Sequence, residues 1–504
     1  MENTLRLLTD EQMRRFITEG FLILNTDFSK AFHDELLEKL NHVYQKEGNP
    51  GNNLLPRVRE LQKVFDHPVV KGALTSVLGP DYMLHAHRHG HYNNSPKPGG
   101  WHKDSYWGYN RTRNIRPWWA MIMYFPQDTP QELGPTGVMP GTQYYESRTF
   151  KSDEAEGEAT AKGAAGTFAL IHYDIWHRST ANTAGLDRYM LKFEFMRTQT
   201  PAAPTWDNRE SEWVTPAAFS TPIVPHEALW RDSWNWLSGR EASEHAVYTA
   251  ETGDTAALLE QLRSGDEQAK AKAADQLALL GGKAAAAGAV PALAAVLEEP
   301  FEPAALNAAY GLARMGEAGV SALLQALRHD SKHVARTAAY GLSVAGEQAV
   351  AGLTEALQSE NEQTVALAVF ALGELQSKAS SALPALIRLL DGPSEAIRRV
   401  AVEALGTIGD PGIDSVVALG KCLKDEDAQV RFMTGLSLCK LGSRAEAAIP
   451  QLIEALEDDN RYVRAHAAEA LYYIGTPKSS EALLDFLRSA RWCPTTTPAS
   501  TFYP

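Results

Sequence analysis

The sequence predicts two architectures in one chain, an antiparallel β-sandwich or jelly-roll barrel followed by an all-α solenoid. Ten of the eleven tryptophans lie between Trp101 and Trp236, whereas alanine, leucine, glutamate, glutamine and glycine dominate after about residue 253. The first part alternates short apolar runs with turn sequences, and the second repeats a helical pattern at a fixed period. With 504 residues the chain exceeds the length at which one core stops growing, so two or more cores are expected.

Charge and cysteine content exclude several classes of function. The net charge of −14 gives no general attraction to phosphate backbones or anionic lipid, so we expect no nucleic-acid and no membrane partner. The three cysteines, Cys422, Cys439 and Cys493, show no paired metal-ligand spacing, which argues against disulfides and cysteine zinc sites. The chain shows neither a signal-peptide pattern at its start nor an apolar stretch approaching 18 residues. These features favour a soluble cytoplasmic protein.

The first part is predicted to begin with helices and to continue as strands. The start LTDEQMRRFITEGFLIL has a capping-box pattern, Thr9 followed by Gln12, then an amphipathic helix that ends near Gly20 and an apolar strand. Further helices are expected around residues 30 to 46 and 68 to 78. The segments YMLHAHRHGHYNN, PWWAMIMYF, GTFALIHYD and RYMLKFEFM are typical of strands, and turn-forming stretches such as NNSPKPGG and ELGPTGVMPGT separate them.

A candidate metal site lies in the strand-rich part. The stretch GGWHKDSYW places His102 and Asp104 on either side of Lys103, and residues i and i+2 at a strand end face the same side. The later stretch IHYDIWHRSTANTAGLDRYMLKF supplies His177 and, eleven residues on, Arg188. Two histidines and a carboxylate leave three positions open on octahedral iron, the arrangement of non-haem Fe(II) oxygenases. A nearby arginine can hold a distal carboxylate bidentately, as a 2-oxoglutarate cosubstrate would require.

These motifs, in this order, resemble the phytanoyl-CoA dioxygenase (PhyH) family of iron- and 2-oxoglutarate-dependent oxygenases. The resemblance covers residues 9 to about 205 and rests on TDEQMRRFITEGFLIL, WHKD, GPTGVMPGT and HRSTANTAGLDR. It implies a double-stranded β-helix and an enzyme that uses Fe(II), 2-oxoglutarate and O2. By this resemblance the iron ligands and catalytic residues are His102, Asp104 and His177, and the residues that bind the 5-carboxylate of 2-oxoglutarate are Arg188 and Ser179.

Three further residues refine the resemblance. Trp119, on the strand after the H-x-D motif, sits where the family often has a cosubstrate-contacting tryptophan. Asn182 matches a family asparagine and is a candidate residue of the substrate pocket. Met190 stands two residues after Arg188, so the R-x-S pattern of some other oxygenases is absent, and Ser179 could replace that hydroxyl. The metal carboxylate argues against the related halogenases, which lack it so that chloride can bind.

The stretch HAHRHGH raises a separate question. It places His85, His87, His89 and His91 at alternate positions, so that an extended strand would point all four imidazoles to one face. One iron cannot use four more histidines. Three interpretations stay open: hydrogen-bonded barrel residues, contacts of His85, His87 or His89 with cosubstrate or substrate, and a second metal.

The loop after the H-x-D motif and the type of reaction also stay open. SYWGYNRTRNIRP combines aromatic residues, including Tyr106 and Trp107, with three arginines, and forms either an exposed loop or a lid over an anionic or aromatic substrate. The implied reaction hydroxylates a C–H bond of a small-molecule or carrier- or protein-bound substrate and releases succinate and CO2; desaturation or ring formation would use the same oxidant. Two alternatives are a scaffold that senses O2 or 2-oxoglutarate while its repeats bind a protein, and a non-oxidative, metal-dependent cupin-like enzyme.

The second part consists of repeats of about 30 to 33 residues, each with two apolar-periodic helices joined by a polar turn. Gly409, Gly442 and Gly475 close three units at equal steps, where glycine suits the positive φ of a helix end. Such paired helices stack into a curved superhelix. The pattern resembles HEAT repeats of the short kind found in phycobilin lyase-type proteins. A stabilising scaffold and a docking surface for a protein partner are both compatible with it.

The expected layout has four parts. A PhyH-like double-stranded β-helix domain with flanking helices spans residues 1–205, and a linker spans residues 206–252. The linker contains the tryptophan-rich helix HEALWRDSWNWLSGR, which is expected to pack on the barrel or on the first repeat, or to form a dimer contact. The HEAT-repeat solenoid spans residues 253–490, and residues 491–504 are expected to form a flexible tail.

Overall fold

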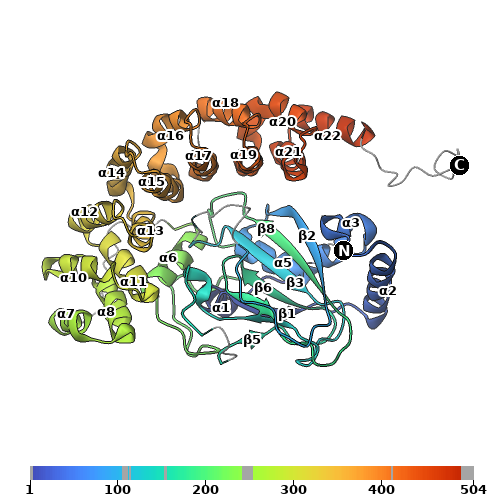
Figure 1. Ribbon diagram of the computed structural model, residues 1–504, viewed down its shortest axis with the longest axis horizontal. Coiled ribbons are helices and arrows are strands. Elements are labelled where there is room, and N and C mark those ends of the chain that lie inside the picture. Colours follow the sequence, from blue (N-terminus) through green and yellow to red (C-terminus); the bar gives the residue numbers. More distant parts are fainter. Residues whose placement is uncertain are drawn as a thin grey trace, which may run out of the picture. The chain divides into compact units, whose positions relative to one another are not determined.

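The computed structural model describes residues 4–104, 112, 115–151, 156–240, 254–409 and 412–489. The chain forms two compact units, residues 1–382 and residues 383–504. Within the described residues, the first unit contains all the strands and the helices up to α15 and η4, and the second contains α16 to α22 (Figure 1). The strand-rich part and the first helical repeats therefore belong to one unit.

The helix predicted at the start is α1, Asp10–Glu19, and its capping box is confirmed. The backbone N–H of Gln12 donates to the hydroxyl of Thr9 (3.3 Å), and the backbone N–H of Thr9 donates to the side-chain oxygen of Gln12 (2.9 Å). Two backbone donors that a helix start leaves unpaired are thereby satisfied. Gly20 ends the helix at a φ of +80°, which glycine adopts without steric cost, and leads into β1, Phe21–Asn25.

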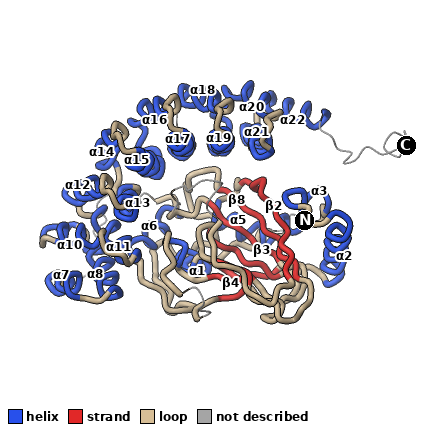
Figure 2. The backbone as a smooth tube through the Cα atoms, viewed as in Figure 1, coloured by secondary structure: helices blue, strands red, loops and turns tan. Residues whose placement is uncertain are grey.

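The strands, red in Figure 2, form two antiparallel sheets. One has the order β1-β6-β3-β8-β2 and the other the order β5-β4-β7, and α5 packs against β3 and β8. The predicted strand-rich domain is confirmed. Its remaining helices and strands are α2 Lys30–Glu47, η1 Gly51–Asn53, α3 Leu54–Arg57, α4 Leu61–Asp66, α5 Pro68–Leu78, β2 Met83–Asn93, β3 Trp119–Tyr124, β4 Thr136–Val138, η2 Thr142–Tyr144, β5 Ala159–Thr160, β6 Thr167–His172, β7 His177–Ser179 and β8 Arg188–Met196.

Strands β2 and β8 set up one polar wall of the domain. Asn93 lies opposite Arg188, and His89 lies opposite Lys192. Residues directly opposite in an antiparallel pair share a face, so these four side chains lie on one side of the sheet. The register shifts between Leu84 and Arg88, which interrupts the strict alternation expected for HAHRHGH.

Helix pairs build the repeats of the first unit, and α8, α11, α13 and α15 contact one another in series. Small residues allow this close approach: a Cβ at Gly341 would lie 2.7 Å from the backbone oxygen of Ala309 on the neighbouring helix. The predicted helical solenoid is confirmed. Its elements in this unit are α7 Thr255–Ser264, α8 Glu267–Leu280, α9 Gly282–Ala286, α10 Ala289–Val296, α11 Glu302–Ala313, α12 Gly316–Ala326, α13 Lys332–Leu342, η3 Glu347–Ala349, α14 Val350–Ala356, α15 Glu362–Glu374 and η4 Gln376–Ala382.

The second unit, taken by itself, contains further helix pairs. Arg398 binds both carboxylate oxygens of Asp425, at 2.7 and 2.9 Å, a bidentate pair that links neighbouring repeats. Gly409, Gly442 and Gly475 have φ values of +88°, +55° and +66°, as their spacing predicts. Its elements are α16 Leu383–Leu389, α17 Glu395–Ile408, α18 Gly412–Cys422, α19 Ala428–Leu441, η5 Gly442–Ala448, α20 Ile449–Ala455, α21 Arg461–Ile474 and α22 Pro477–Ser489. Across the described residues of both units, no helix is long and apolar enough to cross a membrane.

The tryptophan-rich helix is α6, Glu227–Leu237, and all three of its tryptophans are buried. It contacts α1 of the strand-rich part and also α8 and α11 of the repeats. No side chain of its own caps its start. Instead the backbone N–H groups of Glu227 and Ala228 donate to the carboxylate of Asp275 on α8, at 3.0 and 3.1 Å. The helix therefore packs both on the strand-rich part and on the first repeats. A residue of the repeats accepts hydrogen bonds from its first backbone N–H groups.

His226, just before α6, connects the strand-rich part with the first repeats. It is expected to make the free energy of unfolding depend on pH. Its imidazole is buried between the hydroxyl of Tyr145 and the side chain of Asn307. Burial lowers the pKa of His226 to about 4, although Asn307 and the charge of Glu302 act in the opposite direction. The unfolded chain protonates this histidine below about pH 6.5, so its contribution is fully present above that pH. As the pH falls to 4.5, roughly 2 to 3 kcal/mol of stability should be lost.

The test compares urea unfolding of the wild type and of His226→Gln at pH 7 and at pH 4.5. Glutamine can keep neutral hydrogen bonds without titrating, so the variant should lose less stability over this interval. The comparison between two proteins cancels other titrating groups, such as Asp275, whose pKa burial raises to about 6. Equal losses in both proteins would contradict the prediction.

Candidate active site

His102 and His177 face each other across a short antiparallel bridge. The backbone N–H of each donates to the carbonyl of the other, both at 3.0 Å. The Nδ1 atom of each imidazole hydrogen-bonds to the backbone carbonyl two residues earlier. His102 contacts Gly100 at 2.9 Å, and His177 contacts Ile175 at 3.1 Å. With Nδ1 as the donor, Nε2 of each ring is left as the metal-binding atom, and the backbone contact fixes the ring orientation.

Asp104 completes a group that can hold a metal ion. Its Oδ2 atom lies 3.3 Å from Nε2 of His177. One ligand atom from each of His102, Asp104 and His177 lies within 4.8 Å of the others, and we call these three residues the triad. The aspartate and His177 are buried, whereas His102 is exposed. The three residues predicted from the sequence to bind a metal therefore lie together in the structure.

Electrostatics hold Asp104 and His102 in metal-binding protonation states. Burial alone would raise the pKa of Asp104, but His177, Lys192 and His102 outweigh burial and hold that pKa well below its ordinary value. His102 is exposed as a whole residue, but its ring is partly buried, and this desolvation, assisted by His177, lowers the pKa of His102. At neutral pH the triad therefore presents a carboxylate and a neutral His102, the forms that a metal ion requires.

A buried lysine on β8, Lys192, links the triad to further charged side chains in the interior of the domain. The Nζ atom of Lys192 lies 3.1 Å from Oδ2 of Asp104 and 3.5 Å from Oε1 of Glu194. The other carboxylate oxygen of Glu194 lies 3.1 Å from Nδ1 of His85. Burial raises the pKa of Glu194 to about 7, and the nearby lysine opposes that increase. Acidic and basic side chains thus alternate from the triad inward.

Arg188, at the start of β8, is a buried cation without an ion-pair partner in the described part of the chain. Its side chain is 1% exposed, and its Nε and Nη2 atoms have no hydrogen-bond partner among the described residues. Burial lowers its pKa to about 10, so it stays charged at neutral pH. A buried charge of this kind is costly unless an anion reaches it. Two nitrogens on the edge of a guanidinium match the oxygens of a carboxylate.

Other buried polar atoms lie on β2, in the stretch paired with Arg188 to Lys192 of β8. His91 occupies the position on β2 between those opposite Arg188 and Lys192. Its Nε2 atom is buried, and so is Nδ2 of Asn93 opposite Arg188; neither has a hydrogen-bond partner among the residues described. Burial lowers the pKa of His91 to about 3. These atoms fit a ligand that carries several oxygen atoms and extends from the triad to Arg188.

Ser179 and Trp119, the other predicted cosubstrate residues, lie at different places. Ser179 is two residues beyond His177 on β7 and therefore faces the same side of that strand. Trp119 pairs with the last residue of β8, at the opposite end of that strand from Arg188, and its ring lies 5.6 Å from the ring of His85. Ser179 is thus on the triad side, whereas Trp119 lies by the inner end of the charged cluster. Their roles remain predictions.

The histidines of β2 line the interior beside the triad. The rings of His87 and His89 stack with their centroids 5.9 Å apart, and His85 reaches Glu194. Within the described residues the triad is the one group of three or more side chains arranged to hold a metal ion. The histidine strand therefore does not form a second group of that kind.

Asn182 holds the loop before β8 in place. Its Nδ2 atom donates to the backbone oxygens of Asn93, at 3.1 Å, and Leu186, at 2.7 Å. This ties the loop to the end of β2 that faces Arg188. Two other predicted pocket residues, Tyr106 and Trp107, lie outside the described residues.

Lys192 and Glu194 were not predicted from the sequence, although a signal for them exists. In RYMLKFEFM they stand at alternate positions with Arg188, on a strand that is buried throughout. Charged residues on the inner face of a buried strand require partners there. The period of two that identified the strand could also have assigned both side chains to the site.

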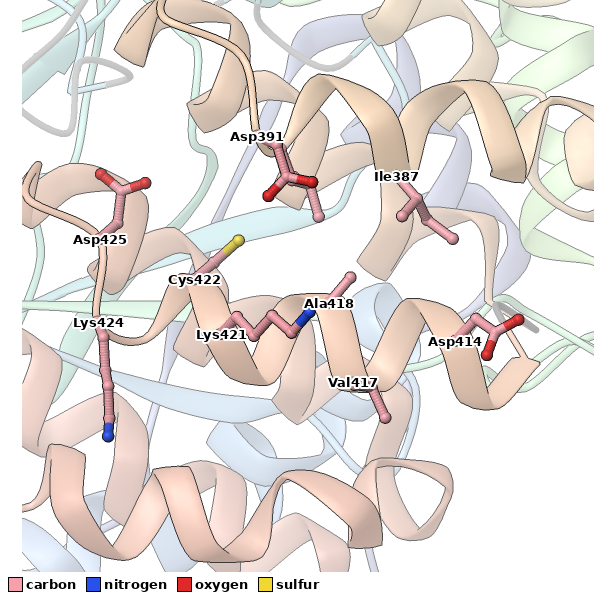
Figure 3. A pocket seen from close by; sticks show the side chains of 10 residues that line it. Ile387, Asp391, Asp414, Val417, Ala418, Lys421, Cys422, Lys424 and Asp425 are labelled. Carbon is pink, nitrogen blue, oxygen red and sulfur yellow. The ribbon is translucent and has the colours of Figure 1, made fainter.

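A separate cavity of about 370 Å³ lies in the second unit, between α16 and α18 (Figure 3). Its lining combines apolar side chains such as Ile387 and Val417 with Asp391, Asp414 and Lys421. It contains no histidine and offers no equivalent of the triad.

Residues 33–190, which contain the triad and Arg188, match the phytanoyl-CoA dioxygenase (PhyH) family. This range is a PhyH-family domain. Iron and 2-oxoglutarate are the cofactors typical of the PhyH family, so this is an Fe(II)/2-oxoglutarate oxygenase domain with the triad as its candidate metal centre. Residues 255–349, 350–419 and 413–493 match HEAT repeats. No curated protein matches the chain significantly.

Solved structures similar to the chain include two non-haem enzymes. The alpha-ketoglutarate-dependent carbocyclase SnoK from nogalamycin biosynthesis is 16% identical, with 38% of this chain and 85% of that chain covered and a TM-score of 0.32. The non-haem monooxygenase ThoJ is 17% identical, with coverage of 40% and 84% and a TM-score of 0.30. An engineered protein is 23% identical, with coverage of 47% and 72% and a TM-score of 0.29.

Proposed function

We propose that the chain is an Fe(II)- and 2-oxoglutarate-dependent dioxygenase that hydroxylates a C–H bond of its substrate and releases succinate and CO2. One observation carries this proposal: the PhyH-family domain combines the triad with Arg188, a buried guanidinium that lacks an ion-pair partner among the described residues. A metal triad alone also suits a non-oxidative reaction. The buried cation favours an enzyme that takes an anionic cosubstrate beside its metal.

Each residue has a defined task in this proposal. The triad holds Fe(II), and the backbone contacts of both imidazoles keep Nε2 directed at the ion. Arg188 binds the 5-carboxylate of 2-oxoglutarate, and the hydroxyl of Ser179 acts as a further donor. His91 and Asn93, whose buried Nε2 and Nδ2 atoms have no hydrogen-bond partner among the described residues, would contact the cosubstrate beside Arg188. When bound, iron and 2-oxoglutarate supply the oxidising power by decarboxylation in the presence of O2.

Lys192 is proposed to act as the internal counterion of the metal carboxylate. In the structure its ammonium lies against Asp104, where a divalent cation would also bind. With a metal ion held at Asp104, the ammonium of Lys192 would offset the negative charge of Asp104 and of a bound cosubstrate. Glu194 keeps the lysine paired throughout.

The substrate is proposed to be a small molecule or a group bound to a carrier or protein. HEAT repeats commonly form extended surfaces for protein interactions, which supports the carrier- or protein-bound form. The PhyH-family domain itself requires a substrate of some kind, and its chemistry selects a C–H bond within reach of the triad.

The experiment that tests the function measures succinate. Full-length protein loaded with Fe(II) in the absence of oxygen should convert 2-oxoglutarate to succinate on exposure to air, whereas chelator-treated protein should not. Slow turnover without substrate is sufficient for this test. Binding of 2-oxoglutarate, seen through its charge-transfer absorption with Fe(II), in the complete absence of succinate would overturn the proposal and favour a sensing scaffold.

A further inference from the structure

The first helix pair of the solenoid makes a buried, charge-assisted contact with the oxygenase part. Glu302, the first residue of α11, is 7% exposed. Its carboxylate accepts hydrogen bonds from the backbone N–H groups of Glu146 and Ser147, at 2.7 and 2.8 Å, and from the Ser147 hydroxyl, at 2.6 Å. A buried carboxylate with three donors fixes the backbone that donates to it, because each bond to a charged acceptor is strong and directional.

A second contact holds the same stretch of chain. The hydroxyl of Tyr145 hydrogen-bonds to Nε2 of His226, and Nδ1 of His226 contacts the side-chain oxygen of Asn307 on α11. Asn307 also donates to the backbone oxygens of Pro225 and Ala271, both at 2.9 Å. The solenoid thus holds both the backbone and the side chains of residues 145–147.

The same stretch binds the immediate chain neighbours of the triad. Lys103, between His102 and Asp104, donates from Nζ to the backbone oxygens of Thr142, at 3.2 Å, and Tyr145. Trp176, directly before His177, donates from its indole nitrogen to the backbone oxygen of Ser147 at 3.2 Å. Lys103 also lies over the ring of Trp176, with Nζ 5.4 Å from its centroid. Residues 142–147 therefore support both chain segments that carry the triad.

We propose that Glu302, and with it the Tyr145–His226–Asn307 contact, positions the metal ligands of the oxygenase site. The inference rests on the proposed iron site and assigns the first HEAT repeats a role in it. Metal ligands must keep their relative placement closely, and groups that orient ligands without touching the metal commonly change metal affinity by about 10- to 100-fold. Residues 142–147 alone separate the segments that carry the triad from Glu302 on α11 in this series of contacts. In this proposal the first repeats of the solenoid hold the chain segment that supports the metal ligands.

The test uses Glu302→Gln in the full-length protein. We expect it to bind Mn(II) about tenfold more weakly than the wild type and to show an altered Fe(II)–2-oxoglutarate charge-transfer spectrum. Glutamine preserves the volume but removes the charge and one acceptor. The matched control is Glu299→Gln, three residues earlier, which removes an ion pair with Lys270 inside the solenoid (2.6 Å). The control should keep both the wild-type affinity and the wild-type spectrum.

Smaller changes keep the test decisive if Glu302→Gln fails to fold. Ser147→Ala and Tyr145→Phe each remove one hydroxyl of the connection, and combining them should weaken Mn(II) binding more than either alone. Folded variants with wild-type Mn(II) affinity and an unchanged spectrum would overturn the positioning role. A wild type that binds no metal would refute the proposed function instead, so the two failures are distinguishable.

Discussion

The Arg188→Met protein should bind 2-oxoglutarate about a hundredfold more weakly than the wild type while its Mn(II) affinity is unchanged. Loss of a bidentate contact to a charged group costs about 3 kcal/mol, which corresponds to that factor. The ligand-free variant should also unfold at a higher temperature, because methionine removes a buried charge that has no ion-pair partner in the described part of the chain. Calorimetry under nitrogen with Mn(II), together with thermal unfolding, measures both effects.

The control for this prediction is Arg197→Met. Arg197 is also buried, but it donates to the backbone oxygen of Val77 at 2.8 Å and lies over the ring of Trp236. Its replacement should lower the unfolding temperature and leave 2-oxoglutarate affinity unaltered in the folded protein. If both variants lost affinity equally, the loss would reflect damage to the core, and the cosubstrate role of Arg188 would be wrong.

Replacing Asp104 with asparagine should reduce Mn(II) affinity by at least about a hundredfold. Even groups that only orient metal ligands account for about 10- to 100-fold, and Asp104 is the one carboxylate of the triad. The variant should also be less stable without metal, because it removes the charge that pairs with Lys192 and breaking a buried pair costs about 3 to 5 kcal/mol. Titration with Mn(II), followed by its electron paramagnetic resonance signal, measures the affinity.

Lys192→Met provides the contrasting variant for the Asp104 test. Its ammonium lies 3.1 Å from Oδ2 of Asp104 and repels a divalent cation at the same carboxylate. At an effective dielectric constant of about 20, this repulsion amounts to several kcal/mol. Mn(II) binding should therefore tighten by at least about tenfold in Lys192→Met. Unchanged affinity in both variants would place the metal elsewhere.

Much of the candidate site could be predicted because its residues follow simple spacings. The i and i+2 spacing of His102 and Asp104 predicts a shared face, and the structure brings both side chains together. The pairing of His102 with His177, however, joins segments far apart in the chain. No local pattern sets that register. The expectation that both histidines share one ion came from the number of ligands that an iron site needs and from the order of motifs in the PhyH family.

The contacts between the solenoid and the oxygenase part could not be predicted. Helix periodicity identifies the buried face of α11 but does not indicate which loop Glu302 contacts, because docking depends on the whole tertiary arrangement. For the same reason, the contacts of the tryptophan-rich helix in the linker could not be predicted. Its sequence favours an amphipathic helix, whereas the acceptor for its first N–H groups, Asp275, comes from another helix. The bulge in β2 is likewise a tertiary feature without a marker in HAHRHGH.

Because Asp275 caps α6 and Glu302 binds the backbone at Glu146 and Ser147, a truncated fragment that ends near residue 250 would lack groups that its own interior uses. Truncation there would leave buried donors without acceptors and uncover the side of α6 that packs on the repeats. Loss of turnover in such a fragment would reflect the loss of these structural contacts. It could not identify the repeats as a docking surface. Dissection of the chain is better made after Ala382, at the boundary between the two compact units, where all of these contacts are kept.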